Sequence, residues 1–306
     1  MNRRGLIALF LGIVLFSTIE VASKLMQVGD ESVAGKYPFW LAFFRFFITG
    51  IVLFYPALRR LQLRGIRLAL RDVAALAGLG LLGVTLMSSL YHLAITYLPA
   101  NIAALVFSCN PVFVVLFAPL VLPEKITVRK LAAVVVCLAG IGVLAFDRAD
   151  GISGSGLMLM LTAIIIFALY TVFFKKMTPR YGALPITAFA GLIGGLCILP
   201  IALGFEGFPL AAYGAADWIG IGYLALIGTA LAYFLFIYGI GHVEASVGSM
   251  AFFLKPFLAA LFAWIVLGEA LTAPELTGGG IILAGMVVAL APGISLGKSF
   301  DRKTRE

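Results

Sequence analysis

Four ionisable side chains lie inside apolar stretches of the sequence, where a charge is costly. Lys255 precedes Pro256 in the run FFLKPFLAALF (252–262), Arg45 lies in FWLAFFRFFITG (39–50), and Glu20 and Lys24 lie four residues apart in STIEVASK (17–24). A charged side chain at the centre of a bilayer costs about 2.5–3.5 kcal/mol even on insertion scales. Residues kept there in spite of this cost bind charged ligands, relay protons or pair with one another.

These four charges do not balance. Lys24, Arg45 and Lys255 are positive and Glu20 alone is negative, which leaves an excess of +2. An apolar interior disfavours such an excess, so either a lysine is neutral at rest or a negative group joins it. We therefore predict a ligand with an anionic group, most simply a carboxylate, with a phosphate as the second possibility. A desolvated Lys255 would also exchange a proton as the ligand leaves.

Each of the four residues also has a structural alternative. Glu20 and Lys24 share a helix face in the favourable acid-first order, so they form an internal pair unless Glu20 serves as a proton or counter-ion site. Lys24 is near a helix end and can extend to the surface. Arg45 either contacts the ligand or forms a permanent bridge to Glu20. Lys255 has no acidic residue one turn away, which makes it the strongest candidate for a ligand contact.

The composition identifies the elements that must position these residues. Hydrophobic residues make up 62% of the 306 residues and charged residues 12%, with a mean hydropathy of +1.11. Segments of about 20 apolar residues cross a hydrocarbon core of about 30 Å as helices. The sequence predicts an all-α integral membrane protein with ten such helices, at 5–26, 37–58, 73–95, 99–121, 130–146, 156–176, 183–204, 217–240, 246–268 and 277–292.

Basic residues mark one side of this helix array. If the N-terminus is cytoplasmic, 17 of the 22 lysines and arginines lie at cytoplasmic ends or connections, whereas Lys36 and Arg148 lie outside. This bias predicts that both termini face the cytoplasm. The net charge of +8 then reflects orientation in a bilayer, and no nucleic-acid partner is expected. Short connections and the lack of an evident transit peptide favour a prokaryotic cytoplasmic membrane, with the chain as a monomer or homodimer.

The cysteines give no sign of metal or disulfide chemistry. Cys109, Cys137 and Cys197 all fall in apolar segments without the spacing of a metal site, so we expect them to pack in the interior and expect no metal or cofactor. The first apolar segment shows no small-residue cleavage pattern and is interrupted by Glu20, so we expect it to be retained as a helix.

The second half of the chain repeats the first. An offset of 145 residues aligns 83–143 with 228–288 without a gap, and 19 of the 61 aligned positions are identical. We therefore assign residues 1–150 and 151–306 to two five-helix repeats, the second with a short cytoplasmic tail. Because each repeat has an odd number of helices, the second must be inverted in the membrane. Inverted repeats build alternating access around a central cavity near the midplane.

The repeat pairs several other residues. Asn110-Pro111 aligns with Lys255-Pro256, so each proline should break its helix and free backbone carbonyls beside a polar side chain. Asn110, Tyr91 and Tyr233 are therefore further candidates for ligand contact, although His92, Tyr238 and the other aromatics at helix ends more often form interfacial belts or local hydrogen bonds. Glu124 and Glu269 precede threonine-initiated helices, and TAPE (272–275) has the form of a capping box, so we assign both glutamates to fold maintenance.

These features together resemble the EamA-type drug/metabolite transporters. The resemblance rests on the repeat, on the aromatic-arginine-aromatic second helix (39–54), and on the exits LPEKIT (122–127) and LGEALT (267–272), and it covers the whole chain. It implies a ten-helix carrier with a central cavity that moves a small metabolite, often outward. The first helix departs from the usual aromatic-glycine pair with uncharged neighbours, which argues against a neutral or aromatic amino-acid substrate by default.

The sequence therefore predicts a secondary active transporter, an exporter of a small carboxylate-bearing metabolite such as an amino acid or organic acid, working by alternating access with possible proton coupling. An exchanger of phosphorylated metabolites or a flippase for a lipid-linked substrate is the alternative. A channel is disfavoured because one chain already contains both halves of a two-fold pathway. An intramembrane enzyme is disfavoured because the chain has no histidine cluster, acidic metal motif or nucleophile elbow.

Overall fold

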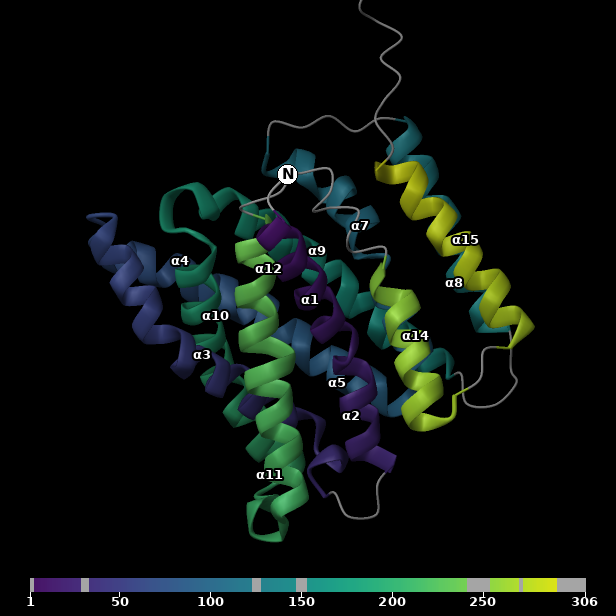
Figure 1. Ribbon diagram of the computed structural model, residues 1–306, viewed down its shortest axis with the longest axis horizontal. Helices are drawn as coiled ribbons and strands as arrows, with labels where there is room; N and C mark the ends of the chain where they lie inside the picture. The colour runs from purple at the N-terminus through teal and green to yellow at the C-terminus, as the bar shows by residue number, and fades with distance from the viewer. Residues whose placement is uncertain are drawn as a thin grey trace, which may run out of the picture.

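The computed structural model describes residues 3–28, 33–122, 128–146, 153–240, 254–269 and 272–290, and all regular elements in these ranges are helical (Figure 1). The longer helices are α1 (Arg3–Ser17), α2 (Ile19–Val28), α3 (Pro38–Leu63), α4 (Leu70–Gly80), α5 (Met87–Tyr97), α6 (Ala100–Phe107), α7 (Asn110–Phe117), α8 (Val128–Phe146), α9 (Gly154–Tyr181), α10 (Ala183–Glu206), α11 (Ala215–Gly222), α12 (Ala232–Ile240), α14 (Leu254–Leu267) and α15 (Ala273–Leu290). Shorter elements are η1 (Ala34–Lys36), η2 (Leu81–Leu86), η3 (Ala118–Leu120), η4 (Pro209–Ala212) and η5 (Tyr223–Leu231).

Six helical stretches of the described chain are long and apolar enough to cross a membrane: Arg3–Gln27, Pro38–Leu63, Leu70–Tyr97, Gly154–Tyr181, Ala183–Glu206 and Ala215–Phe236. Four shorter apolar helical stretches are Ala100–Val114, Leu131–Val143, Leu254–Leu267 and Leu276–Gly285. This composition is that of an integral membrane protein. A part of the ninth expected span, residues 246–253, lies outside the described residues.

Two of the apolar stretches, counted in chain order, are interrupted beside polar candidate residues. The first changes from α1 to α2 at Thr18, where the Thr18 hydroxyl donates to the carbonyl of Leu15 (2.8 Å), two residues before Glu20. The fourth changes from α6 to α7 at Ser108 and Cys109, directly before Asn110-Pro111. Proline cannot donate a backbone hydrogen bond to the preceding turn, so the predicted break at this pair is confirmed.

Two other stretches contain π-helical turns. η2 widens the helix between α4 and α5, and η5 widens it between α11 and α12. The 145-residue offset places η2 over residues 226–231, so both widened segments end at equivalent positions. Turns with i→i+5 hydrogen bonds are rare and are frequent at functional sites.

Glycines bring two helix pairs into close contact. α3 packs along α10, with Gly50 against Leu192 and Gly195 against Phe47. A Cβ atom at Gly195 would lie only 2.9 Å from the Phe47 nitrogen, so no larger residue fits without a shift. These two contacts are equivalent in the repeat. The 145-residue offset relates Gly50 to Gly195 and Phe47 to Leu192, so it converts each contact into the other.

The second close helix pair, α8 and α15, shows the same repeat symmetry. α8 packs along α15 at the right of Figure 1. A Cβ atom at Gly140 would lie 2.8 Å from the Gly278 carbonyl oxygen, and one at Gly285 would lie 3.1 Å from the Ala133 carbonyl oxygen. The offset relates Gly140 to Gly285 and Ala133 to Gly278, so these contacts also exchange.

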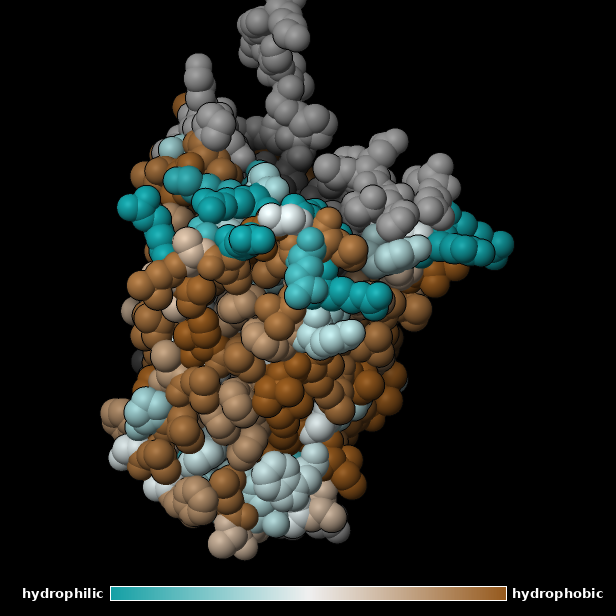
Figure 2. Space-filling model, turned by 90° about the vertical axis from the view of Figure 1, so that its left-hand side faces the viewer, coloured by the Kyte–Doolittle hydropathy of each residue, from teal (hydrophilic) through white to brown (hydrophobic). Residues whose placement is uncertain are grey.

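The outer surface matches this interior. Figure 2 shows a broad hydrophobic band over the side formed by α3, α4 and α10, with hydrophilic residues gathered beyond one end of the band. The exposed basic residues at that end of these helices and their connection are Arg59, Arg60, Arg64, Arg67 and Arg71. An apolar band bounded by arginines is the surface expected of helices packed in a bilayer.

Candidate functional site

An ion pair lies in the interior between the first and ninth apolar stretches. Lys255 at the start of α14 donates to Oε1 of Glu20 on α2 over 2.6 Å. Glu20 is 0% exposed and Lys255 is 6% exposed. The Lys255 ammonium also lies 4.8 Å from the centre of the Phe107 ring on α6, in a cation–π contact.

A second buried cation, Arg45, also lies in the bundle interior. Arg45 on α3 donates from Nε to the Thr229 hydroxyl (2.8 Å), and its Nη1 lies 3.2 Å from Nε2 of His92. Thr229 in turn donates to the carbonyl of Leu224, five residues earlier, within the widened turns of η5. Among the described residues Arg45 forms no ion pair within 4.0 Å, so its charge rests on neutral partners.

Aromatic rings join these two groups. Tyr91 and His92 are adjacent on α5 and both are buried. The Tyr91 ring contacts the Phe107 ring edge-on at 5.0 Å, and Phe107 is the ring beneath Lys255. His92 contacts Arg45, so a continuous path of contacts runs from Lys255 to Arg45. We call Glu20, Arg45, Tyr91, His92, Phe107, Thr229 and Lys255 the buried cluster.

Several polar atoms around the buried cluster have no hydrogen-bond partner among the described residues. They are Glu20 Oε2, Ser23 Oγ, Ser88 Oγ, Ser89 Oγ, His92 Nδ1 and Asn110 Nδ2. Buried polar side chains in native proteins are nearly always bonded, so a concentration of free ones needs an explanation.

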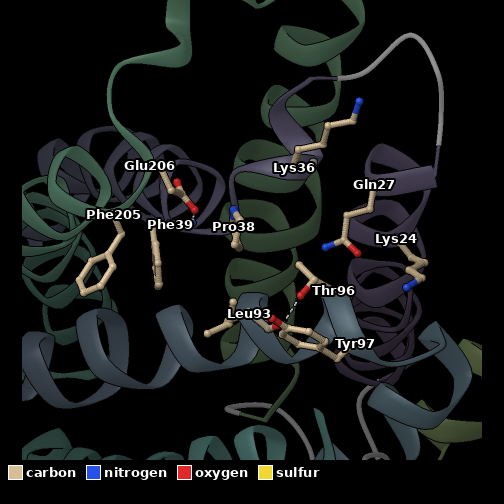
Figure 3. Close-up of a pocket in the computed structure, with 11 residues that line it drawn as sticks. Lys24, Gln27, Lys36, Pro38, Phe39, Leu93, Thr96, Tyr97, Phe205 and Glu206 are labelled. Carbon is tan, nitrogen blue, oxygen red and sulfur yellow. Dashed lines mark hydrogen bonds between the residues drawn. The ribbon is translucent and has the colours of Figure 1, made fainter. Parts of the chain in front are cut away.

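An open pocket lies at one end of the bundle, where α2, η1, α3, α5 and α10 meet (Figure 3). Its volume is about 800 Å³. In Figure 3 the Gln27 amide points toward the middle of the pocket, and both of its polar atoms lack a partner in the described chain, whereas the Lys36 ammonium points away. The remaining lining residues are Lys24, Gly35, Pro38, Phe39, Leu93, Thr96, Tyr97, Phe205 and Glu206.

One face of α2 leads from this pocket to the buried cluster. Gln27 lines the pocket, Ser23 lies one turn deeper, and Glu20 lies a further turn in. Residues spaced by three and four positions share a helix face, so the three polar side chains form a line. Lys24 also lines the pocket, next to this line.

The structure corrects three expectations about the charges. Lys255 does have an acidic partner, since the packing of α14 on α2 brings it to Glu20. Glu20 and Lys24 do not pair, because Lys24 turns toward the end of α5 and donates to the carbonyl of Ile95 (3.2 Å). Arg45 does not bridge to Glu20 in the described chain, because Thr229 and His92 occupy its donors.

The charge count changes accordingly. Lys24 is half-buried in the open pocket, so it does not belong to the dry interior. The interior then holds Arg45, Lys255 and Glu20, an excess of +1 in place of the expected +2.

The remaining predicted residues fall into two groups. Tyr233 is partly buried and packs edge-on against Phe16 at 5.1 Å, and Tyr238 is 39% exposed. His92 was expected in an interfacial belt or in local hydrogen bonds and Tyr91 was a candidate for ligand contact; both are buried in the interior.

The structure describes most of the residues that were assigned to maintaining the fold. Both carboxylate oxygens of Glu269 accept backbone N–H groups at the start of α6, from Ala100 (3.0 Å) and Asn101 (3.1 Å). Glu269 thus caps a helix of the other half of the chain. Pro256 is buried at the start of α14, and Pro111 is the second residue of α7. Glu124 lies outside the described residues.

Sequence reasoning missed Thr229, Phe107 and the buried serines. Thr229 sits among apolar residues with no charge near it in the sequence, and its role depends on the widened turns of η5. The serines at 88 and 89 precede Tyr91-His92 in MSSLYH, a polar patch within an apolar helix that was a usable signal. Within the described residues no three potential metal ligands come together.

Comparisons with known proteins agree with this architecture. A model of the EamA-like transporter family matches residues 3–146 and 154–291. An uncharacterized transporter of Clostridium kluyveri is 29% identical over 295 residues, 94% of this chain and 93% of its own. A probable terminal-alkyne amino-acid exporter of Streptantibioticus cattleyicolor is 25% identical over 222 residues, 71% of this chain and 73% of its own. One solved crystal structure, 21% identical, aligns with a TM-score of 0.63 over 94% of this chain and 97% of that chain.

Proposed function

The chain belongs to the EamA-like transporter family, and from this we propose that it is a secondary active transporter that exports a small carboxylate-bearing metabolite, such as an amino acid or organic acid, by alternating access. It is a transporter and not an enzyme, as are the relatives named above. We propose that it lies in the cytoplasmic membrane with both termini on the cytoplasmic side.

Alternating access requires two related halves, and several observations support them. The family model matches two consecutive stretches of similar length. The glycine contacts between α3 and α10, and between α8 and α15, exchange under the 145-residue offset. The contact of α1 with α12 has a counterpart in that of α9 with α5. Such exchange is what a two-fold axis between inverted five-helix repeats produces.

The excess positive charge carries the proposal of a carboxylate. Arg45 and Lys255 carry two positive charges against one carboxylate, that of Glu20, which pairs with Lys255, while Arg45 is bonded to neutral groups. Desolvated guanidinium and ammonium groups bind carboxylates through charge-assisted hydrogen bonds. The exporter of Streptantibioticus cattleyicolor, named for an amino acid, is a relative whose substrate class also contains a carboxylate.

A substrate route follows from the line of polar residues on α2. In the described structure the pocket is open at one end of the bundle, which we propose is the outer end, while the buried cluster is closed to solvent. A substrate carboxylate that replaces Glu20 at Lys255 would free Glu20, and Lys24 is one turn away to receive it. This exchange of partners would keep Lys255 and Glu20 compensated, and a proton taken up by Glu20 would link export to the proton gradient.

Counterflow in proteoliposomes tests the proposal. We expect the purified chain to accumulate labelled amino or organic acids against unlabelled acid inside, because a carrier exchanges substrate and a channel does not. Lys255→Ala should abolish the exchange and Lys255→Arg should retain part of it. Lys176→Ala, an exposed lysine of α9, is the control and should leave it unchanged. Full exchange by Lys255→Ala would reject the role of Lys255.

A further inference from the structure

The unpartnered polar atoms around the buried cluster divide into donors and acceptors, and this division describes a ligand. Arginine can only donate hydrogen bonds, so Nε2 of His92, 3.2 Å from Arg45 Nη1, must accept. The proton of a neutral His92 ring is therefore on Nδ1. Nδ1 is buried without a partner in the described chain, so His92 holds a free N–H donor beside a buried cation.

Asn110 adds a second free donor. Its Nδ2 group is buried without a partner in the described residues. Asn110 follows Phe107 by three positions, and Phe107 contacts both Lys255 and Tyr91. Asn110 is also the position that the repeat relates to Lys255. The free His92 donor thus accompanies Arg45, and Lys255 supplies a second cation in the same cluster; such groups bind carboxylates.

Glu20 offers the opposite chemistry. Oε1 of Glu20 accepts from Lys255, while Oε2 is buried and has no partner within 3.5 Å among the described residues; the Tyr91 hydroxyl is the neighbouring donor that reaches this carboxylate. A buried carboxylate oxygen that is not fully hydrogen-bonded is destabilising, because its lost hydration is not replaced. A ligand that carries a hydroxyl or ammonium group near its carboxylate would satisfy this oxygen. A simple aliphatic acid would leave Tyr91 as the only donor near this oxygen.

The charge count sets the net charge of that ligand. Arg45, Lys255 and Glu20 together carry +1, so a ligand of net charge −1 neutralises the site. A dicarboxylate without an amine would reverse the excess, and a zwitterion of net charge zero would leave it in place. Uncompensated charge of either sign is disfavoured in a low-dielectric interior.

We propose that the buried cluster selects an organic acid of net charge −1 with a hydrogen-bond donor on the carbon next to its carboxylate, that is, a 2-hydroxy acid or an acidic amino acid. The carboxylate lies between Lys255, Arg45 and the His92 Nδ1–H group, and the donor faces Glu20 Oε2. This inference rests on the proposed function, because it names the substrate class of the same site.

Thermal stabilisation of the purified full-length chain by a matched set of acids tests the inference, since a ligand of the folded state raises its apparent stability. 2-Hydroxybutyrate and butyrate share a net charge of −1 and differ in the donor. 2-Aminobutyrate keeps a donor at zero net charge. Glutamate and glutarate differ in the amine. We expect 2-hydroxybutyrate and glutamate to bind at least about tenfold more tightly than butyrate, 2-aminobutyrate and glutarate, the size of one lost buried hydrogen bond.

Two variants separate ligand binding from folding. Glu20→Gln raises the excess charge to +2, so it should shift the preference from glutamate toward glutarate. Ser88→Ala removes a buried hydroxyl that is one turn from His92 and has no partner in the described chain. It should leave the melting temperature of the free protein unchanged or raised and weaken binding of 2-hydroxybutyrate about three- to tenfold. Ser17→Ala, whose hydroxyl is already bonded to Ile13, is the matched control and should bind as wild type.

The outcomes distinguish this inference from the function on which it rests. Equal stabilisation by 2-hydroxybutyrate and butyrate, or an unchanged preference in Glu20→Gln, would overturn the inference and leave the carboxylate carrier intact. Loss of stability in the free Ser88→Ala protein with unchanged binding would assign the serine to folding and also count against it. If none of the five acids stabilises the protein, the carboxylate carrier itself is rejected.

Discussion

At the scale of single residues, the pair formed by Lys255 and Glu20 raises the question of why the apolar interior contains charges. Its 2.6 Å contact is fully desolvated, and the cost of removing both charges from water offsets most of their attraction. A buried ion pair is therefore weak evidence for stability. Its presence in an apolar bundle is better explained by a task that requires charge.

Removing one member of this pair should separate stability from transport. Lys255→Met leaves an uncompensated buried carboxylate, and we expect it to lower the free energy of unfolding by about 3–5 kcal/mol. The double variant Glu20→Met, Lys255→Met should regain most of that loss, because two apolar side chains of similar volume need no solvation. Melting temperatures in detergent measure the first effect, and counterflow measures transport, which we expect to be absent from both variants. Transport by the double variant would show that the pair is structural.

Arg45 should be sensitive to the shape of its cation. Its Nε and Nη1 atoms reach Thr229 and His92 together, and a lysine ammonium cannot reproduce this fork. We therefore expect Arg45→Lys to lower the transport rate by about tenfold or more, the equivalent of one lost buried hydrogen bond of about 1.4 kcal/mol. Lys176→Arg, on the exposed surface of α9, is the control for a lysine–arginine exchange. Wild-type transport by Arg45→Lys would show that charge alone suffices.

These same residues show how much of the site could be predicted from the sequence. The apolar surroundings of Glu20, Arg45 and Lys255 were enough to predict that they are buried. Their partners could not be predicted, because Glu20 meets Lys255 across 235 residues and Arg45 meets Thr229 across 184. Such contacts depend on the angles at which helices cross, and no local pattern encodes these angles.

At the scale of helices, the glycines at the close helix contacts are the positions that tolerate substitution least. Gly195→Val places side-chain atoms against the backbone of α3, where even a Cβ atom would lie 2.9 Å from the Phe47 nitrogen. Overpacking of this kind costs about 1–3 kcal/mol. We expect a lower melting temperature by thermal denaturation in detergent. A Cβ atom at Gly204, in the same helix α10, would have no neighbouring atom within 4 Å, so Gly204→Val should melt as wild type.

The cap on α6 is a second element-scale feature. Glu269 accepts two backbone N–H groups at the start of that helix, over 3.0 and 3.1 Å. Glu269→Ala leaves both donors without the carboxylate, and we expect a loss of about 0.5–2 kcal/mol in the free energy of unfolding. Glu269→Gln retains one acceptor oxygen and should lose less. Equal stability of wild type and Glu269→Ala in denaturant titrations would show that water replaces the cap.

Element boundaries were largely predictable, and their interruptions were not. Hydropathy alone located the apolar helices, and Pro111 marked the break between α6 and α7. The π-helical turns in η2 and η5 carry no sequence mark, because their residues are as apolar as the helices on either side. The turn at Thr18 was missed because threonine within an apolar helix is common.

At the scale of the whole molecule, orientation in the membrane is the feature most open to test. In a variant lacking Cys109, Cys137 and Cys197, we expect a cysteine at Lys36 to react with a membrane-impermeant thiol reagent added to intact cells. A cysteine at Arg64 should react only after the cells are opened, because the arginine-rich end of the molecule faces the cytoplasm. Both positions are exposed in the structure, so access alone does not distinguish them. The reverse pattern would invert the topology.

The paired π-helical turns have a consequence for ancestry. An extra residue enters a helix by insertion, and in this chain the widened turns end at equivalent positions in the third and eighth apolar stretches. A single insertion made after the gene had duplicated would have widened one of them and left the other regular. One insertion in the sequence before it was duplicated accounts for both widened turns.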